Sequence, residues 1–367
     1  MKKYVLLVVA MIVVLVAIAA CAPAPTATPV PPPPTQPPAP TTAPAAAASP
    51  TAAPKPTVPP PACAKLPNAP AAPAAGQLGS PDKPIVITFV PSGDTGKITV
   101  AGTAIADCLT KMTGLTYKIE VGTSFAASIE AMGAGKAQVG FLNTFSDLLA
   151  EAKYGVVPVL SSMRQYNSIP MDPDYALGSK MQAFYKGEFI TQKTSGIKTL
   201  ADLKGKTFCF VDPNSTSGYI IPRIVLAANG INPDKDLKAT VNAGSHNNVG
   251  IAVYKGDCDA GSTFIDIVTD KAANLQATYP DIADKVVPFY VTDKIPNDGV
   301  QVVKDLDPKI TDATVAGLLA FAKDPGGNAV LVALYAINDF QKIDSSFYKD
   351  FAALLKKAGV DPTTLVK

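Results

Sequence analysis

Three consecutive hydroxyl residues lie where an apolar strand pattern gives way to an apolar helix pattern. The run Lys206–Val211 indicates a buried strand, and Tyr219–Asn229 carries apolar residues at helical spacing. Ser215, Thr216 and Ser217 stand between the two. The first N–H groups of a helix have no internal partner and carry partial positive charge, so this turn can hold a tetrahedral oxyanion through backbone and hydroxyl donors. The same residues also suit an ordinary helix cap, and both interpretations stand on this evidence.

Two residues next to this turn indicate how its backbone is arranged. Gly218 has no side chain, so we expect it to let the backbone come close to a ligand. Pro222 lacks an N–H and crowds the carbonyl group four residues earlier, so we expect a separate first turn or a kink there.

A second candidate group contains the only histidine of the chain. His246 follows Ser245 in a loop that enters a helix. An imidazole can donate a hydrogen bond to an oxyanion, and its charged form adds attraction. Asp259, further along, would repel a dianion unless it accepts a proton or an amine of the ligand; alternatively it only hydrogen-bonds a turn. A competing hypothesis is an enzyme that uses His246 as base or nucleophile beside Ser245, although the sequence offers no second histidine to orient it.

Strand and helix patterns alternate on both sides of these residues, with short loops between them. The expected strands are 84–90, 117–121, 137–142 and 156–160, and a second α/β unit spans roughly residues 190–287. This alternation predicts parallel, doubly wound sheets, in which ligands bind beyond the carboxyl ends of the strands. The loops 92–95, 122–124 and 143–144 should therefore form one rim, and Ser124 and Thr144 are candidate ligand contacts there. We expect the C-terminal helices, from Thr311 onward, to cover the first sheet.

The N-terminus has the pattern of an export signal followed by a tether. Lys2 and Lys3 precede the apolar run Val5–Ala17, and Ile18-Ala19-Ala20-Cys21 resembles a bacterial lipobox, which implies lipidation of Cys21. We therefore predict a signal peptide over 1–20 and a Pro/Ala/Thr-rich disordered tether over 21–81.

Four further cysteines remain, and an exported protein meets an oxidising compartment. The spacing of these four cysteines alone allows three disulfide pairings. We predict Cys209–Cys258 within the second unit and Cys63–Cys108, which would staple the end of the tether to a helix of the first.

The composition excludes two other classes of function. The formal net charge is +2 and the chain has only two arginines, Arg164 and Arg223, which argues against nucleic-acid binding. A zinc site is not expected either, since there is one histidine and no Cys-x-x-Cys spacing.

The order of motifs over residues 195–261 resembles the phosphate/phosphite/phosphonate-binding proteins of ABC transporters. The resemblance rests on the run Asp212–Tyr219, the Gly244-Ser245-His246 loop, the Asp259-Ala260-Gly261 turn and the later Ile295–Asp298 turn. It implies that Ser215, Thr216, Ser217, Ser245 and His246 hold a phosphorus oxyanion. The chain departs from the family pattern at Phe125, where a tyrosine is common, and at Asn143-Thr144, where Gly-Pro is usual. Those positions face the rest of the ligand.

The resemblance also implies an architecture and a role. The fold would be a two-lobed periplasmic-binding-protein-like α/β fold of type II, with residues 82–189 and 288–367 in one lobe and 190–287 in the other. The protein would be an exported, lipid-anchored binder that delivers its ligand to an ABC permease, with neither a cofactor nor enzymatic activity. A ligand-sensing module of a receptor is the remaining alternative.

Overall fold

The computed structural model describes residues 58–166, 168–177 and 180–362. These residues belong to one compact unit, Pro56–Lys367. The predicted signal peptide, Cys21 and most of the predicted tether lie outside the described residues. Within the described ranges, no helix combines the length and the apolar character needed to cross a membrane.

The first sheet contains the strand that the sequence predicts over 84–90, which the structure shows as β1. Its strands are β1 (Ile85–Phe89), β2 (Tyr117–Val121), β3 (Val139–Leu142), β4 (Val157–Gln165), β5 (Met181–Gln182), β13 (Gly299–Val302) and β14 (Asp339–Lys342). They are ordered β14-β4-β13-β3-β1-β2, and β5 pairs with β4. Every residue of β1 is buried, as expected for a strand that is covered on both faces.

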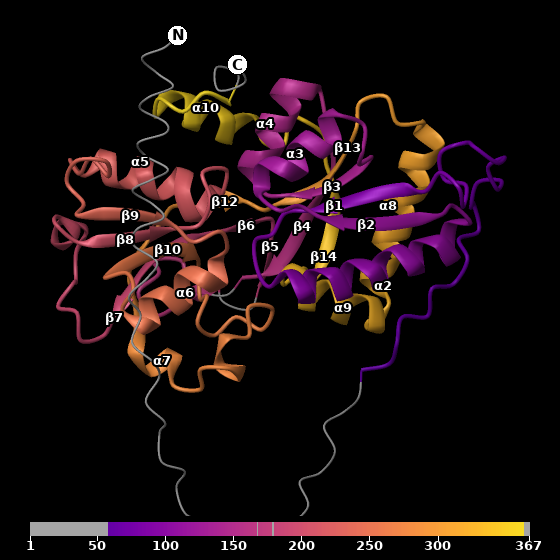
Figure 1. Cartoon of the computed structure of the whole chain (residues 1–367). Helices are drawn as coiled ribbons and strands as arrows, with labels where there is room; N and C mark the ends of the chain where they lie inside the picture. The colour runs from indigo at the N-terminus through magenta and orange to yellow at the C-terminus, as the bar shows by residue number, and fades with distance from the viewer. Residues whose placement is uncertain (1–57, 167, 178–179, 363–367) are drawn as a thin grey trace, which may run out of the picture. The chain divides into compact units, whose positions relative to one another are not determined.

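Helices cover both faces of this sheet (Figure 1). Ile85, Ile87 and Phe89 pack with the apolar residues of α2 (Thr95–Thr113), α8 (Pro308–Lys323) and α9 (Pro325–Tyr335). The alternate residues Val86 and Val90 pack with α3 (Phe125–Gly133) and with Ala150 of α4 (Thr144–Tyr154). We call this sheet with its helices the first lobe.

The second lobe is built on a smaller sheet. Its strands are β7 (Gly187–Gln192), β8 (Thr207–Phe210), β9 (Ala239–Asn242), β10 (Ala260–Phe264) and β11 (Val286–Val291), in the order β11-β7-β10-β8-β9. The helical segments are α5 (Ile221–Ala228), α6 (His246–Lys255), α7 (Ile282–Lys285), and the short turns η2 (Leu200–Leu203), η3 (Thr216–Ile220) and η4 (Leu275–Ala277).

The expectation of purely parallel sheets is wrong in both lobes. In the first sheet β14 and β5 are both antiparallel to β4. β13 is antiparallel to both β3 and β4, and β7 is antiparallel to both β10 and β11. β7 begins the second lobe and β13 begins the return to the first. Neighbouring parallel strands need a crossover connection, whereas antiparallel strands do not.

The two crossings between the lobes pair with one another. β6 (Phe184–Tyr185), just after the short turn η1 (Tyr175–Leu177) and β5, pairs antiparallel with β12 (Ile295–Pro296). The last helix, α10 (Lys349–Lys357), packs at this place rather than on the first sheet, which corrects our expectation. Its Phe351 and Leu355 join Phe145, Ile220 and Ile295 in one apolar cluster. α10 therefore covers the junction between the lobes.

The segment 58–81 is packed against the first lobe, although we predicted it as part of a disordered tether. Leu66 and Leu78 pack on the core, and the Leu66 N–H donates to the Met112 carbonyl at 2.8 Å. Both predicted disulfides, Cys63–Cys108 and Cys209–Cys258, are present. A Pro/Ala-rich composition misled the prediction because a few apolar side chains and one covalent bond suffice to fix an irregular segment.

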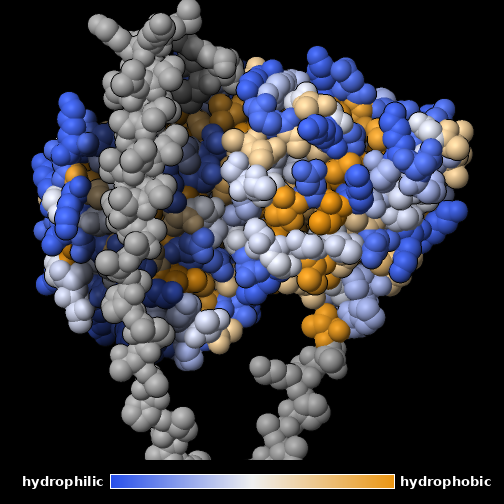
Figure 2. Space-filling view, in the orientation of Figure 1, coloured by the Kyte–Doolittle hydropathy of each residue, from blue (hydrophilic) through white to orange (hydrophobic). Residues whose placement is uncertain are grey.

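The surface agrees with a core that is enclosed inside each lobe. On the face shown in Figure 2, hydrophobic residues reach the surface in separate small groups among hydrophilic ones.

Candidate functional site

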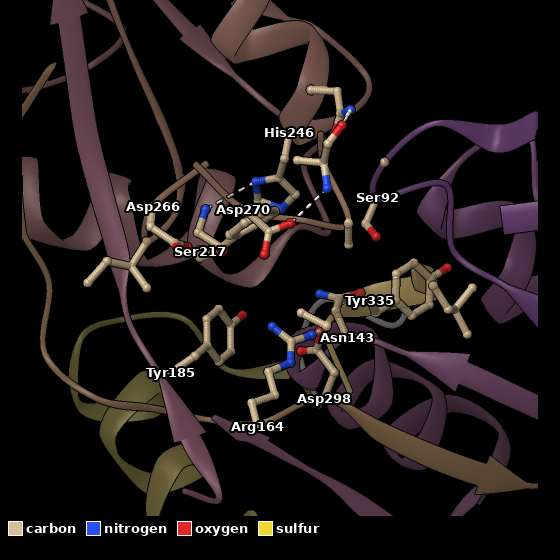
Figure 3. Close-up of a pocket in the computed structure, with 18 of the residues that line it drawn as sticks. Ser92, Asn143, Arg164, Tyr185, Ser217, His246, Asp266, Asp270, Asp298 and Tyr335 are labelled. Atoms are coloured by element: carbon tan, nitrogen blue, oxygen red, sulfur yellow. Dashed lines mark hydrogen bonds and ion pairs between the residues drawn. The ribbon is translucent and has the colours of Figure 1, made fainter. Parts of the chain in front are cut away.

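A pocket lies between the two lobes, at the carboxyl ends of their strands (Figure 3). Ser92 follows β1 and Asn143 follows β3 in the first lobe, while Ser215 follows β8 and His246 follows β9 in the second. The cavity has a volume of about 80 Å³, several times the ~10–15 Å³ that one water needs. Of the three loops predicted to form one rim, 92–95 and 143–144 contribute residues to the cavity lining, whereas no residue of 122–124 does.

The hydroxyl turn forms a separate helical turn before α5. Ser215 caps the π-helical turn η3, and its Oγ accepts a hydrogen bond from the Gly218 N–H at 3.2 Å. Pro222 lies in the first turn of α5, which begins at Ile221, so the predicted break in the helix is confirmed. Gly218 serves packing and not a ligand: a Cβ there would lie 2.3 Å from Val211 Cγ2.

Thr216 connects the two lobes through its hydroxyl oxygen. Oγ1 accepts from the Phe145 N–H and from Asn143 Nδ2, each at 2.9 Å. A hydroxyl oxygen has two acceptor positions, and these two donors use both. The hydroxyl proton is left for a further acceptor, and Thr216 lines the pocket.

His246 is buried, and its hydrogen bonds define its tautomer. Its backbone N–H donates to the Ser92 carbonyl at 2.9 Å, across the two lobes. Nδ1 accepts from the Phe264 N–H at 3.2 Å, so the neutral ring carries its proton on Nε2, which lies 3.4 Å from Ser215 Oγ. Burial, aided by the nearby Arg164 guanidinium, lowers the pKa of His246 to about 3. At pH 7 the imidazole is a neutral donor, and the charged form considered above does not apply to this arrangement.

Three residues that we predicted as ligand contacts, Ser124, Thr144 and Ser245, lie outside the pocket lining. Ser124 Oγ accepts from the Ala127 N–H as the cap of α3, and Ser245 Oγ accepts from the Asn248 N–H as the cap of α6. Thr144 Oγ1 donates to the Pro296 carbonyl at 2.7 Å. Ser215, Thr216, Ser217, His246 and Phe125, by contrast, line the cavity.

Asp259 is at the wrong end of the sheet to meet a ligand in this pocket. It is exposed and its carboxylate accepts from the Thr207 N–H at 2.8 Å, at the amino ends of β8 and β10. The residues that follow those strands, not those that precede them, line the cavity. Asp259 therefore does not face the pocket, and its carboxylate hydrogen-bonds the first residue of β8 rather than a turn.

The pocket also contains charged groups that sequence reasoning did not propose. Arg164, at the end of β4, lies 3.7 Å from the Asp298 carboxylate and 5.5 Å above the centre of the Tyr185 ring. Burial raises the pKa of Asp298, although Arg164 partly opposes this, and burial likewise raises the pKa of Asp270. The available signals were weak: Arg164 is one of only two arginines, and Asp298 ends a turn that belongs to the motif run.

Residues 87–348 match a protein family that is described as "ABC transporter, phosphonate, periplasmic substrate-binding protein". The chain belongs to this phosphonate-binding family. The family consists of substrate-binding proteins, so the enzymatic hypothesis built on His246 and Ser245 is set aside.

Two curated proteins show the same relationship over part of their length. The chain is 26% identical over 194 residues to the "Phosphate-import protein PhnD" of Mycolicibacterium smegmatis, covering 51% of this chain and 56% of that protein. It is 32% identical over 155 residues to the "Phosphonates-binding periplasmic protein" of Escherichia coli, covering 41% of this chain and 44% of that protein. The chain therefore spans about half the length of the curated relatives it matches.

Solved structures confirm the two-lobed type II fold. A binding protein component of an ABC phosphonate transporter from Pseudomonas aeruginosa aligns with a TM-score of 0.64 at 20% identity, covering 75% of this chain and 87% of that one. PhnD1 from Prochlorococcus marinus, in complex with methylphosphonate, aligns with a TM-score of 0.63 at 18% identity, covering 75% and 98%.

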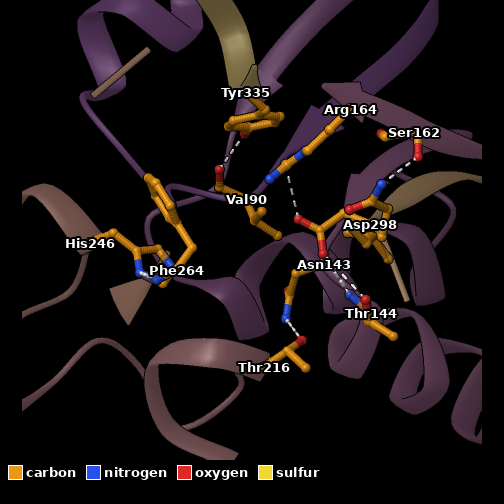
Figure 4. Close-up of polar contacts among 12 residues, drawn as sticks. Val90, Asn143, Thr144, Ser162, Arg164, Thr216, His246, Phe264, Asp298 and Tyr335 are labelled. Carbon is orange, nitrogen blue, oxygen red and sulfur yellow. Dashed lines mark hydrogen bonds and ion pairs between the residues drawn. The ribbon is translucent and has the colours of Figure 1, made fainter. Parts of the chain in front are cut away.

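Two of the positions where the chain departs from the family pattern lie in the pocket. Phe125 and Asn143 line it, whereas Thr144 faces the crossing segment at Pro296. Figure 4 shows Asn143 reaching toward Thr216 of the second lobe, close to Asp298 and Arg164.

Proposed function

We propose that this protein captures a phosphonate or a related phosphorus oxyanion, such as phosphite or phosphate, in the pocket between its lobes. The observation that carries the proposal is the convergence of hydrogen-bond donors from the second lobe on one cavity. The Thr216 hydroxyl proton, the Ser217 side chain and the His246 Nε2–H all belong to residues that line the cavity. They follow the strand–turn–helix pattern that suits a tetrahedral anion.

We further propose that binding and release occur by motion of one lobe against the other. The boundaries predicted above, with residues 190–287 in one lobe and the flanking segments in the other, place Thr216 and Asn143 on opposite sides. Hydrogen bonds such as Asn143 Nδ2 to the Asn214 carbonyl, 2.8 Å, would then form on closure and break on opening. Closure would bring the oxyanion into contact with both lobes before delivery to an ABC permease.

The anion site can be tested with one variant and a matched control. Ser217→Ala removes a hydroxyl from the pocket lining, whereas Ser124→Ala removes one that only caps α3. A hydroxyl bonded to a charged group contributes about 1.5–3 kcal/mol, so Ser217→Ala should weaken binding roughly ten- to hundredfold and Ser124→Ala should leave it unchanged.

The measurement is calorimetric titration with phosphate, phosphite, methylphosphonate, 2-aminoethylphosphonate and sulfate. We expect saturable binding of at least one phosphorus compound, which is recovered chemically unchanged. Absence of binding to all of them, or equal losses in both variants, would contradict the proposed function.

We also propose that the protein is exported and anchored through a lipidated Cys21. The basis is the lipobox-like sequence before that residue and the periplasmic description of the family. Mass spectrometry of the mature N-terminus should show a diacylated cysteine, and Cys21→Ser should move the protein from the membrane fraction to the soluble fraction. A mature chain without lipid would refute the anchor and leave the binding proposal intact.

A further inference from the structure

A small side cavity adjoins the ligand pocket on the first-lobe side. Ser92, Asn143, Arg164, Asp298 and Tyr335 line both spaces. The side cavity has a volume of about 10 Å³, close to the ~10–15 Å³ that one water or one hydroxyl oxygen occupies. It is therefore large enough for a single polar atom of a ligand.

Asn143 supplies an acceptor at this corner. The residue is 5% exposed, and its Nδ2 donates to the Asn214 carbonyl at 2.8 Å and to Thr216 Oγ1 at 2.9 Å. A carbonyl can only accept, so this contact fixes the orientation of the side-chain amide. Its Oδ1 is buried and has no hydrogen-bond partner among the described residues.

Arg164 supplies a donor at the same corner. Its Nε is also buried without a hydrogen-bond partner in the described part of the chain. The side chain is held in place by Asp298, 3.7 Å from Nη2, and by the Tyr185 ring. In Figure 3 the Arg164, Asn143 and Asp298 side chains lie together at one side of the pocket, across from His246.

A group that satisfies this corner must both accept from Arg164 and donate to Asn143. An ammonium group donates but is repelled by the guanidinium, and a carboxylate accepts but meets Asn143 Oδ1 and the Asp298 carboxylate. A methyl group satisfies neither partner. A hydroxyl group has one proton to donate and lone pairs to accept, and it is the only one of the four that matches both.

We propose that the preferred ligand is a phosphonate whose substituent carries a hydroxyl group, and that Asn143 and Arg164 select it. This inference rests on the proposed function, since it assumes that the oxyanion binds at the Ser215–Ser217 turn and at His246. The hydroxyl then lies on the first-lobe side, at the position where Asn143 replaces the glycine usual in the family.

The test compares two ligands that differ by one oxygen. Hydroxymethylphosphonate and methylphosphonate are titrated calorimetrically into the full mature chain, with 2-aminoethylphosphonate and phosphonoacetate as charged alternatives. A hydrogen bond to the charged guanidinium should favour hydroxymethylphosphonate over methylphosphonate about tenfold or more. The ratio of the two affinities is the readout, because general effects on folding or closure change both affinities together.

Variants assign the preference to this corner. Arg164→Gln should reduce the ratio to within about threefold, whereas Arg223→Gln should preserve it, because Arg223 pairs with Asp234, outside the pocket lining. If Arg164→Gln fails to fold, Asn143→Leu offers a second variant: it removes the Oδ1 acceptor and should likewise reduce the ratio to within about threefold.

The outcomes separate this inference from the proposed function. Equal affinity of the wild-type protein for both phosphonates would show that water fills the corner and would overturn the inference alone. A preference for the amine or the carboxylate compound, or a ratio that survives Arg164→Gln, would overturn it as well. Failure to bind any phosphorus oxyanion would overturn the proposed function.

Discussion

Thr216→Val should reduce ligand affinity far more than it reduces the stability of the ligand-free protein. The change keeps the shape of the side chain and removes the oxygen that accepts from the Phe145 N–H and from Asn143 Nδ2. Asn143 Nδ2 retains the Asn214 carbonyl, but the Phe145 N–H has no other hydrogen-bond partner among the described residues.

The magnitude follows from two losses. Leaving a buried N–H unpaired costs about 1–3 kcal/mol, and losing a hydrogen bond to a charged ligand costs about 1.5–3 kcal/mol. Together they amount to about 2.5–6 kcal/mol, which corresponds to a roughly hundredfold to ten-thousandfold weaker Kd. When the lobes separate, water can bond to the Phe145 N–H, so the unfolding free energy without ligand should change by less than about 1 kcal/mol.

Calorimetric titration with methylphosphonate and thermal melting without ligand, on the same protein samples, measure the two quantities. Thr216→Ser keeps the hydroxyl and is the control, which should bind within about tenfold of wild type. An affinity of Thr216→Val within threefold of wild type would refute the role of Thr216 in both closure and anion binding. A large fall in the ligand-free melting temperature would show instead that the interlobe contacts persist without ligand.

Three further perturbations test other features. Burial raises the pKa of Glu188 from 4.5 to about 7, so its stabilising contribution is complete only below pH 4.5 and is lost as pH rises through 7. Glu188→Gln should gain roughly 3 kcal/mol of unfolding free energy over wild type between pH 4.5 and pH 8, and a constant difference in urea titrations would contradict this. A chain that begins at Val58 should bind its ligand like the full mature chain and melt at the same temperature. A chain that begins at Gly79 loses the Cys63–Cys108 disulfide and should lose about 2–5 kcal/mol of stability. Equal melting temperatures of the two truncated chains would count against the packing of the 58–81 segment. Lys186→Met leaves the buried Asp172 carboxylate without its 2.7 Å ion-pair partner and should cost about 3–5 kcal/mol in denaturant unfolding, so a loss below 1 kcal/mol would disprove the importance of this pair.

The sequence predicted the parts of the site that begin helices. The strand Lys206–Val211 and the helix after it have clear apolar periodicity, and the capping residues between them can be recognised by type alone. The pocket-lining role of Ser215, Thr216, Ser217 and His246 follows from their position after a strand, and it agrees with the cavity in the structure.

The errors arise from strands that carry no periodic signal. β10, Ala260–Phe264, has the sequence Ala-Gly-Ser-Thr-Phe, which is short and polar yet almost wholly buried in the middle of the second sheet. Because that strand was not recognised, its direction was unknown, and Asp259 was placed at the ligand although it precedes the strand. Burial of small polar residues depends on neighbours that are distant in sequence, which a local pattern does not contain.

Arg164 was missed for a related reason. β4 continues past its apolar part through Ser161 and Ser162, which are buried in the sheet, so the strand seemed to end at Leu160. With the strand drawn to its true end, the rule that ligands bind beyond carboxyl ends would have placed Arg164 at the pocket. The pairing of Arg164 with Asp298 comes from the return crossing, and only the tertiary structure brings those two segments together.

The disulfide between Cys63 and Cys108 has a mechanical consequence for an anchored protein. A force applied along the N-terminal segment is transmitted at Cys63 through the disulfide to α2, whose Cys108 is part of the core. The residues between the two cysteines, including all of β1, are bypassed by this load. If Cys21 is lipidated as proposed, tension from the membrane would therefore not act on β1 directly, and the rim that begins with Ser92 would keep its shape under that force.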